Sequence, residues 1–259
     1  MLAARDLAVP ARLAGVTLEL RGGEVTAICG PNGAGKSTLL ACLSGLLDGG
    51  HDAVTIGGVA LDDMHPDERA RLLGYLPQSP EVAWDVTVET LIGIGRLPWR
   101  GAPAGETAEA IARAIAAMDL EDLRQRPVSR LSGGERARVL LARVLAGEPR
   151  WLLADEPLAN LDLAHAATLM ARFKAEARSG RGVVVVLHDL AAAMNHADRV
   201  LVLDQGRIVA DGPPQQALGE EILAQVWGVD AHWLGEAGAR ALAITETPLA
   251  AHSACANPV

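Results

Sequence analysis

The stretch that decides the fold runs from Val25 to Thr38 and reads VTAICGPNGAGKST. Its first five residues are mostly apolar and end at a glycine, which predicts a buried strand. The residues from Gly30 onward have the spacing G-x-x-x-x-G-K-[ST], and from Lys36 apolar residues recur at helical spacing. We therefore expect a strand, a glycine-rich loop and a helix in this order.

This loop has the composition of a polyphosphate-binding site. Gly33 and Gly35 let the backbone curl so that successive amide N–H groups point inward, and the helix N-terminus adds partial positive charge. We expect Lys36 to reach the β- and γ-phosphates, Ser37 to give its hydroxyl to Mg²⁺ and Thr38 to donate toward the α-phosphate. The expected phosphate-binding residues are Gly30, Pro31, Asn32, Gly33, Ala34, Gly35, Lys36, Ser37 and Thr38. The alternative is a glycine-rich turn with an ordinary surface lysine.

Length and composition limit the classes of protein. The 259 residues are 50% hydrophobic, enough for a sizeable core. No uncharged apolar run approaches the ~18 residues of a membrane-spanning helix, and the start MLAARDLAVP has no apolar signal-peptide centre, so we expect a cytoplasmic protein. The net charge of -9 disfavours a general nucleic-acid binder. Cys29, Cys42 and Cys255 have no metal-ligand spacing and are expected to act as small core hydrophobes.

A second group of polar residues follows the apolar run in WLLADEP, from Trp151 to Pro157. The run predicts a buried strand that carries two acids at its end. We expect Asp155 to bind the metal ion and Glu156 to polarise an attacking water. A solvated strand end is the alternative, and the phosphate loop makes the catalytic interpretation the better one.

The third motif is LSGGE, from Leu131 to Glu135, hereafter the signature segment. Ser132 is a good helix N-cap, and Gly133 and Gly134 expose backbone N–H groups to an anion. The segment is therefore a second candidate phosphate-binding surface, although a plain helix cap is the alternative.

The remaining sequence is organised around these motifs. Further strands are expected at Val54–Ile56, Val183–Leu187 and Val200–Leu203, and their apolar character suits a sheet covered on both faces. We expect residues 1–259 to form one domain, with a core at 1–80 and 150–212 and a helical insertion at 81–149. Residues 213–259 are expected to form a small extension with a helix around Leu218–Val226, a strand at Ala241–Thr245 and a disordered tail.

The motifs GPNGAGKST, LSGGE, LLADEP and ANLD at Ala159–Asp162, followed by His188, together resemble an ABC transporter nucleotide-binding domain over roughly Leu7 to Gly212. The resemblance implies an α/β fold, with a P-loop NTPase core of mostly parallel sheet flanked by helices, an antiparallel β subdomain and an inserted α-helical subdomain. It also implies ATP and Mg²⁺ as cofactors and a head-to-tail homodimer. In that dimer the phosphate loop of one subunit and the signature segment of the other enclose one ATP.

The resemblance gives roles to further residues. Gln78, in YLPQSP, would contact Mg²⁺ and the attacking water and sense the membrane partner, although a plain loop glutamine is the alternative. His188, in VVVVLHDL, would hold the γ-phosphate and Glu156 in register, and Asp162 would support the subunit interface. The expected catalytic residues are thus Glu156, His188, Gln78 and Lys36, and the expected metal ligands are Ser37, Gln78 and Asp155.

One feature of the family is missing from this sequence. The family commonly stacks adenine on an aromatic residue before the phosphate loop, whereas Leu7 to Leu20 offers only Val9, Pro10, Arg12 and Leu13. We expect Arg12 or an aliphatic side chain to cover the base, with a weaker preference for adenine over guanine.

Finally, a free ATPase chain without membrane helices is typical of importers in this family. The stretches DVTVETLIGIGRLPW, Asp85–Trp99, and VWGVD, Val226–Asp230, resemble ATPases that serve uptake of iron-siderophores, haem and vitamin B12. This implies peripheral location at the cytoplasmic side of the inner membrane, with integral permease subunits as partners, a substrate-binding protein as an indirect one and no nucleic acid. The alternatives are an ABC ATPase for another substrate, a soluble one acting on nucleic acid or translation, and a stand-alone phosphate-loop kinase.

Overall fold

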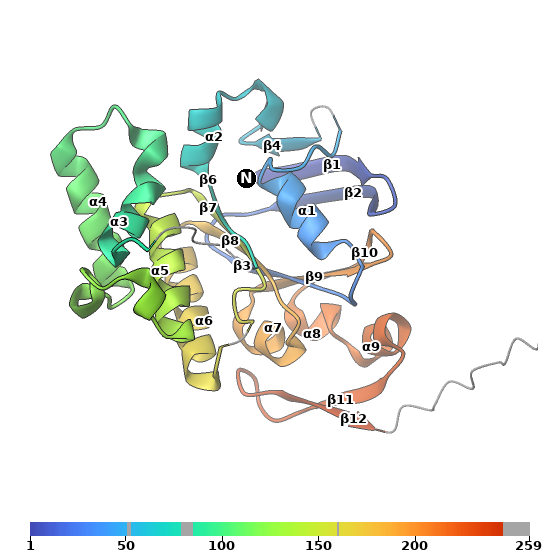
Figure 1. Cartoon of the computed structure of the whole chain (residues 1–259). Helices are drawn as coiled ribbons and strands as arrows, with labels where there is room; N and C mark the ends of the chain where they lie inside the picture. The colour runs from blue at the N-terminus through green and yellow to red at the C-terminus, as the bar shows by residue number, and fades with distance from the viewer. Residues whose placement is uncertain (51–52, 79–84, 160, 246–259) are drawn as a thin grey trace, which may run out of the picture.

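A computed structural model describes residues 1–50, 53–78, 85–159 and 161–245. Its centre is a six-stranded sheet (Figure 1) in which every neighbouring pair is parallel except β9 with β10. The strand order across this sheet is β10 (Arg207–Gly212), β9 (Arg199–Asp204), β3 (Val25–Cys29), β8 (Gly182–Val186), β7 (Trp151–Asp155) and β6 (Leu73–Leu76).

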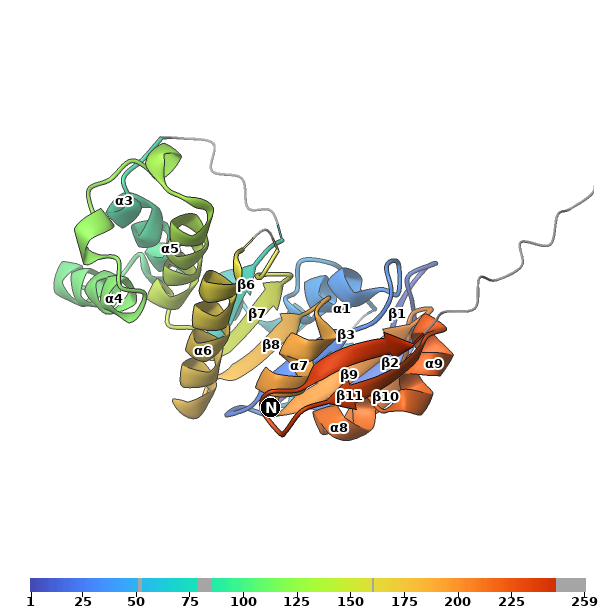
Figure 2. The same ribbon diagram turned by 90° about the horizontal axis from the view of Figure 1, so that it is seen from below.

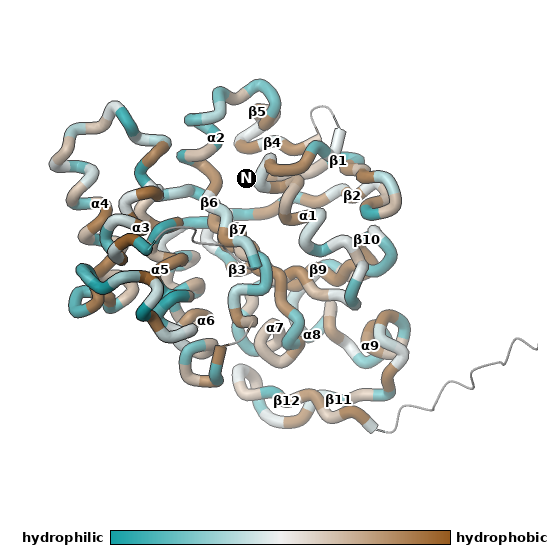
Figure 3. The backbone as a smooth tube through the Cα atoms, in the orientation of Figure 1, coloured by the Kyte–Doolittle hydropathy of each residue, from teal (hydrophilic) through white to brown (hydrophobic). Residues whose placement is uncertain are grey.

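The central strands are buried on both faces, because alternate residues of a strand point to opposite sides of the sheet. Val25 and Ala27 of β3 belong to one hydrophobic core, and Ile28 belongs to the other. The same alternation holds in β8, where Val183 and Val184 fall in different cores. Figure 3 shows the result as brown, hydrophobic backbone through β3 and β9. The continuous apolar runs in the sequence therefore reflect a sheet covered on both sides.

One face is covered by α1 (Lys36–Leu43) and by a four-stranded antiparallel sheet. The order in that sheet is β2 (Leu13–Leu20), β1 (Leu2–Val9), β4 (Val54–Ile56) and β5 (Val59–Ala60). A short 3-10 helix, η1 (Leu61–Asp63), and α2 (Pro66–Leu72) lead from this sheet to β6. Among the described residues, five strands and two α-helices thus precede β6, the edge strand of the central sheet.

The other face is covered by helices from three parts of the chain. They include α5 (Gly133–Ala146), α6 (Leu163–Arg178) and α7 (Leu190–His196). Figure 2 shows α5 with α3 (Val88–Gly93) and α4 (Ala104–Ala117) as a helical body beside the β6 edge of the sheet. This body also contains the 3-10 helices η2 (Ile94–Trp99), η3 (Glu121–Leu123) and η4 (Val128–Arg130).

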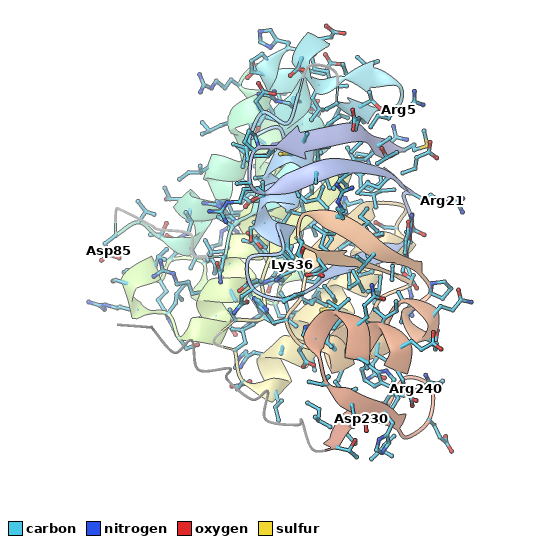
Figure 4. All side chains as sticks on the ribbon, turned by 90° about the vertical axis from the view of Figure 1, so that its right-hand side faces the viewer. Arg5, Arg21, Lys36, Asp85, Asp230 and Arg240 are labelled. Carbon is cyan, nitrogen blue, oxygen red and sulfur yellow. The ribbon has the colours of Figure 1, made fainter. Side chains whose placement is uncertain are left out.

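The C-terminal part docks on α7. It consists of α8 (Pro214–Ala217), α9 (Glu220–Trp227) and a hairpin of β11 (Asp230–Leu234) and β12 (Ala241–Thr245). Asn195 at the end of α7 donates to the Arg240 carbonyl and accepts from the Arg240 amide, both at 2.8 Å. Figure 4 labels Asp230 and Arg240 on this hairpin.

The predicted fold class is confirmed, since a mostly parallel sheet, an antiparallel sheet and a helical body are all present. The strands expected at Val25–Cys29, Val54–Ile56 and Ala241–Thr245 have those bounds, and Cys29 and Cys42 are buried. The expectations for Cys255 and for the tail after residue 245 lie outside the described residues. The division at residues 80, 149 and 212 stays a prediction.

Candidate functional site

The candidate site lies at the carboxyl ends of four neighbouring strands, where ligands of open α/β sheets bind. The phosphate loop follows β3, and His188 follows β8. Asp155 ends β7 with Glu156 directly after it, and Gln78 comes two residues after the end of β6. Because β3, β8, β7 and β6 are parallel neighbours, residues from four distant parts of the sequence meet at one edge.

The phosphate loop is held between two other segments by close backbone approaches. Gly30 has φ +148°, and a Cβ there would lie 2.1 Å from the Leu203 carbonyl oxygen at the end of β9. Gly35 has φ +101°, and a Cβ there would lie 2.7 Å from the Arg12 carbonyl oxygen. The Gly206 amide also donates to the Ala34 carbonyl at 3.0 Å. Glycine is needed at positions 30 and 35 for both space and backbone conformation.

Lys36 lies inside the loop (Figure 4) and is only 5% exposed. Its ammonium donates to the carbonyl oxygens of Gly30 and Pro31, each at 2.9 Å. Burial lowers the pKa of Lys36, while the charges of Glu156 and Asp155 oppose that shift. The carboxylates beside it therefore help Lys36 to remain a cation in a buried position.

Asp155 and Ser37 bring two oxygen ligands together. The Ser37 hydroxyl donates to Asp155 Oδ1 at 3.1 Å, and Asp155 is 4% exposed. Burial raises the pKa of Asp155, and the hydrogen bond from Ser37 opposes this. Within the described residues there is no cluster of three or more His, Cys, Asp or Glu suited to a metal. A hydroxyl and one buried carboxylate nevertheless fit Mg²⁺, which is usually held by one or two protein groups together with phosphate oxygens.

Glu156 is held at both carboxylate oxygens. Gln78 donates from Nε2 to Oε2, and His188 Nε2 forms a hydrogen bond with Oε1. The Glu156 backbone has φ +48°, a left-handed conformation that is rare for a non-glycine residue and recurs at functional sites. Asp189, which follows His188, caps α7 by accepting from Ala191 N and Ala192 N. The Glu156 side chain is thus oriented from two neighbouring strands.

The signature segment begins α5 with a complete capping box. Ser132 accepts from the Glu135 amide at 3.2 Å, and Glu135 accepts from the Ser132 amide at 2.8 Å, so the predicted N-cap is confirmed. Gly133 is exposed, and a Cβ there would meet no atom of the described residues within 4 Å. Its free face can therefore be approached by a ligand.

The structure brings some expected residues together and separates others. Gln78 and His188 are each hydrogen-bonded to Glu156, and Ser37 is hydrogen-bonded to Asp155. The signature segment starts α5, whereas the phosphate loop starts α1, and Figure 2 shows these helices on opposite sides of β6 and β7. Asp162 caps α6 by accepting from the His165 amide at 2.9 Å. Asn160, in the ANLD motif, lies outside the described residues.

Sequence reasoning missed the residues that support the loop from outside. Leu203, near the end of β9, and Gly206, just after it, contact the loop through backbone atoms, which leave no residue pattern. The turn at Leu203-Asp204-Gln205-Gly206 was a possible signal, because Gln205 has φ +46° and Gly206 has φ +76°. His165, which packs on Gly134, was also missed.

Comparison with known proteins identifies the family. The family model described as "ABC transporter" matches residues 13–159, which is more than half of the chain. The chain belongs to the ABC transporter family. It is an ATP-binding subunit of this family and an ATPase, and such subunits act as dimers with membrane permease subunits.

Curated relatives agree with this assignment. The chain is 48% identical over 219 residues to the hemin import ATP-binding protein HmuV of Rhodococcus jostii (strain RHA1), covering 82% of this chain and 73% of the relative. It is 43% identical over 223 residues to the protein of that name from Pseudomonas aeruginosa, covering 84% of this chain and 87% of the relative.

Solved structures agree as well. The cbiO1 protein of Clostridium perfringens has a TM-score of 0.77 at 26% identity, covering 86% of this chain and 92% of that one. The dimeric bacterial ABC transporter cassette MJ0796 has a TM-score of 0.72 at 26% identity, covering 83% and 99%. Among the described residues, no helix is sufficiently long and apolar to span a membrane.

The loop geometry predicts a difference between two glycines. Gly30→Ala should lower the free energy of unfolding more than Gly33→Ala. Gly33 has φ +80°, but a Cβ there would meet no atom within 4 Å among the described residues. At Gly33 the cost is about 1–2 kcal/mol for left-handed backbone. At Gly30 the contact with the Leu203 carbonyl adds to that cost. Urea unfolding of both variants measures the difference, with Gly105→Ala on the open face of α4 as a control that should not destabilise. Equal losses at Gly30 and Gly33 would contradict the close approach.

Proposed function

We propose that this ATPase drives the uptake of haem or a related iron chelate through a membrane permease. The observation that carries the cargo assignment is the likeness to hemin import ATP-binding proteins, at 48% and 43% identity over more than four-fifths of the chain. The chain would sit at the cytoplasmic side of the membrane, bound to the permease, and receive cargo signals from a substrate-binding protein. In this arrangement the cargo never touches the ATPase.

The phosphate loop would bind the triphosphate of ATP. Residues Gly30 to Gly35, except Pro31, would supply backbone N–H groups, and the N-terminus of α1 would add partial positive charge. Lys36 would exchange its bonds to the Gly30 and Pro31 carbonyls for the β- and γ-phosphates, and Thr38 would donate toward the α-phosphate. Ser37, Asp155 and Gln78 would hold Mg²⁺, which would offset the charge of the phosphate oxygens.

Glu156 would act as the base in hydrolysis. It would accept the proton of a water whose oxygen bonds to the γ-phosphorus while the bond to the bridging oxygen breaks. Support comes from its fixed position, since Gln78 and His188 hold the two carboxylate oxygens. His188 would also contact the γ-phosphate and keep it in register with Glu156.

The partner subunit would complete the site. The signature segment would contribute Ser132, Gly133 and Gly134 to ATP bound by the other copy, and Asp162 would lie at the interface. ATP would then hold two copies together, closure would move the helical bodies and the attached permease, and hydrolysis would release them.

The base assignment predicts a specific kinetic defect. Glu156→Gln keeps the shape and a hydrogen-bond acceptor but removes the proton acceptor, so steady-state ATP hydrolysis should fall by roughly 10²- to 10⁴-fold. ATP affinity should stay within about threefold, because the phosphate loop is unchanged. Phosphate release and fluorescent-nucleotide titration measure the two quantities. Unchanged turnover would refute the role of Glu156.

The transport assignment predicts stimulation by cargo. The chain should co-purify with a polytopic permease, and its ATPase activity in proteoliposomes should rise with a haem-loaded binding protein but not with the empty one. Glu156→Gln in the same proteoliposomes is the matched negative control. Stimulation by a vitamin B12-loaded binding protein alone would replace haem as cargo. Activity that responds to nucleic acid and not to the permease would refute transport.

The exposed turn before the phosphate loop predicts weak base selectivity. Arg12 is exposed there, its carbonyl faces Gly35, and a planar guanidinium stacks on adenine and guanine alike. We expect kcat/KM for ATP and GTP to agree within about tenfold, and Arg12→Ala to weaken both nucleotides by a similar factor. The control is Arg5→Ala, because Arg5 is also exposed but lies on β1 (Figure 4). A loss for ATP alone would show that Arg12 reads the base edge.

A further inference from the structure

The two glycines of the signature segment have different surroundings. Gly133 is open, whereas Gly134 is buried beneath the ring of His165. A Cβ at Gly134 would lie 2.2 Å from His165 Cδ2 and 2.5 Å from both Cγ and Nε2. These separations are far below van der Waals contact, so the ring lies directly against the Gly134 backbone. Position 134 therefore needs glycine because of a contact within its own subunit.

The His165 ring is itself held by Asp162. Its Nδ1 lies 2.8 Å from both carboxylate oxygens of Asp162, and the His165 amide donates to Asp162 Oδ1 at 2.9 Å. Asp162 is the N-cap of α6, and His165 is in its first turn. The ring can therefore move away from Gly134 only by giving up its own bonds to the carboxylate that caps α6.

This chain of contacts joins two exposed surfaces. Ser132 and Gly133 are exposed at the start of α5, and Asp162 is exposed at the start of α6. Leu163, next to Asp162, is 91% exposed. The contact between buried Gly134 and the partly exposed ring of His165 joins these two surfaces.

We propose that His165 is a positioning residue that fixes the signature segment against the Asp162 segment within one subunit. The proposal rests on the proposed function, in which both segments face the partner copy and its ATP. His165 touches neither ATP nor the reacting atoms in this role. It presents two interface segments in one arrangement before closure, so that ATP-driven closure does not have to order them separately.

A double-mutant cycle tests this role. The variants are His165→Ala, Gly134→Ala and the pair, each in the Glu156→Gln background, in which ATP-bound dimers should accumulate. Sedimentation at several protein concentrations gives the dimer dissociation constant with ATP and Mg²⁺. Each single variant should weaken the dimer by roughly 10- to 100-fold, the cost of a small misplacement. The pair should lose no more than the worse single variant, because the new methyl group fills space that the ring has left.

Rescue and control variants separate positioning from general stability. His165→Asn keeps an amide N–H where Nδ1 lies and should restore dimerisation to within about threefold of the parent. Thr168→Ala, which removes an exposed side-chain bond one turn later on α6, should leave it unchanged. In the active background, His165→Ala should lower kcat while the thermal midpoint of the ATP-free protein changes little.

The outcomes distinguish two failures. A Glu156→Gln parent that stays monomeric with ATP and Mg²⁺ would overturn the proposed dimeric function. If the parent dimerises and His165→Ala dimerises equally well, the positioning role alone is overturned. The same holds if the losses caused by His165→Ala and Gly134→Ala simply add in the double variant. Failure of His165→Asn to restore dimerisation would overturn it too.

Discussion

The parallel pairing of β3, β8, β7 and β6 is the constraint on which the site depends. Apolar side chains of these strands pack into the hydrophobic cores on the two faces of the sheet, and they take no part in the chemistry. Their pairing nevertheless fixes where the next residue of each segment lies. Gln78, Glu156 and His188 are 78 and 32 residues apart in sequence, and they meet because their strands end at one edge.

The same edge includes unusual backbone conformations. Glu156 has φ +48°, and the phosphate loop contains three glycines with positive φ. Such conformations persist only when the surroundings enforce them. Here the enforcement comes from the Leu203 and Arg12 carbonyls against the loop, and from the bonds of Gln78 and His188 to Glu156. The rigid sheet therefore supports a loop whose amides are arranged before any ligand binds, which lowers the entropy cost of binding.

Sequence alone predicted the parts of the fold that carry a local pattern. The run VVVV identified β8, and the spacing G-x-x-x-x-G-K identified the loop, because burial and phosphate binding each restrict neighbouring residues. Strand β6 was not predicted, since its four residues include a glycine and are too short to alternate clearly. Strand β1 was not predicted because Arg5 and Asp6 interrupt it, and Asp6 has φ +47° at an irregularity in the pairing with β2. The contact of His165 with Gly134 joins segments 31 residues apart, and neither segment alone indicates it.

The separation of the two anion-binding helix ends explains why one copy is insufficient in the proposed mechanism. Lys36, the N-terminus of α1 and Mg²⁺ would together offset less charge than a triphosphate, Asp155 and Glu156 carry at this edge. The N-terminus of α5, where Gly133 is open to a ligand, is a second source of partial positive charge. This helix end lies in the helical body, across β6 from α1. A second subunit can bring that helix end to the phosphates without bending the sheet. Electrostatic demand at a rigid strand edge therefore favours closure between copies, and the γ-phosphate that creates the demand is the group that hydrolysis removes.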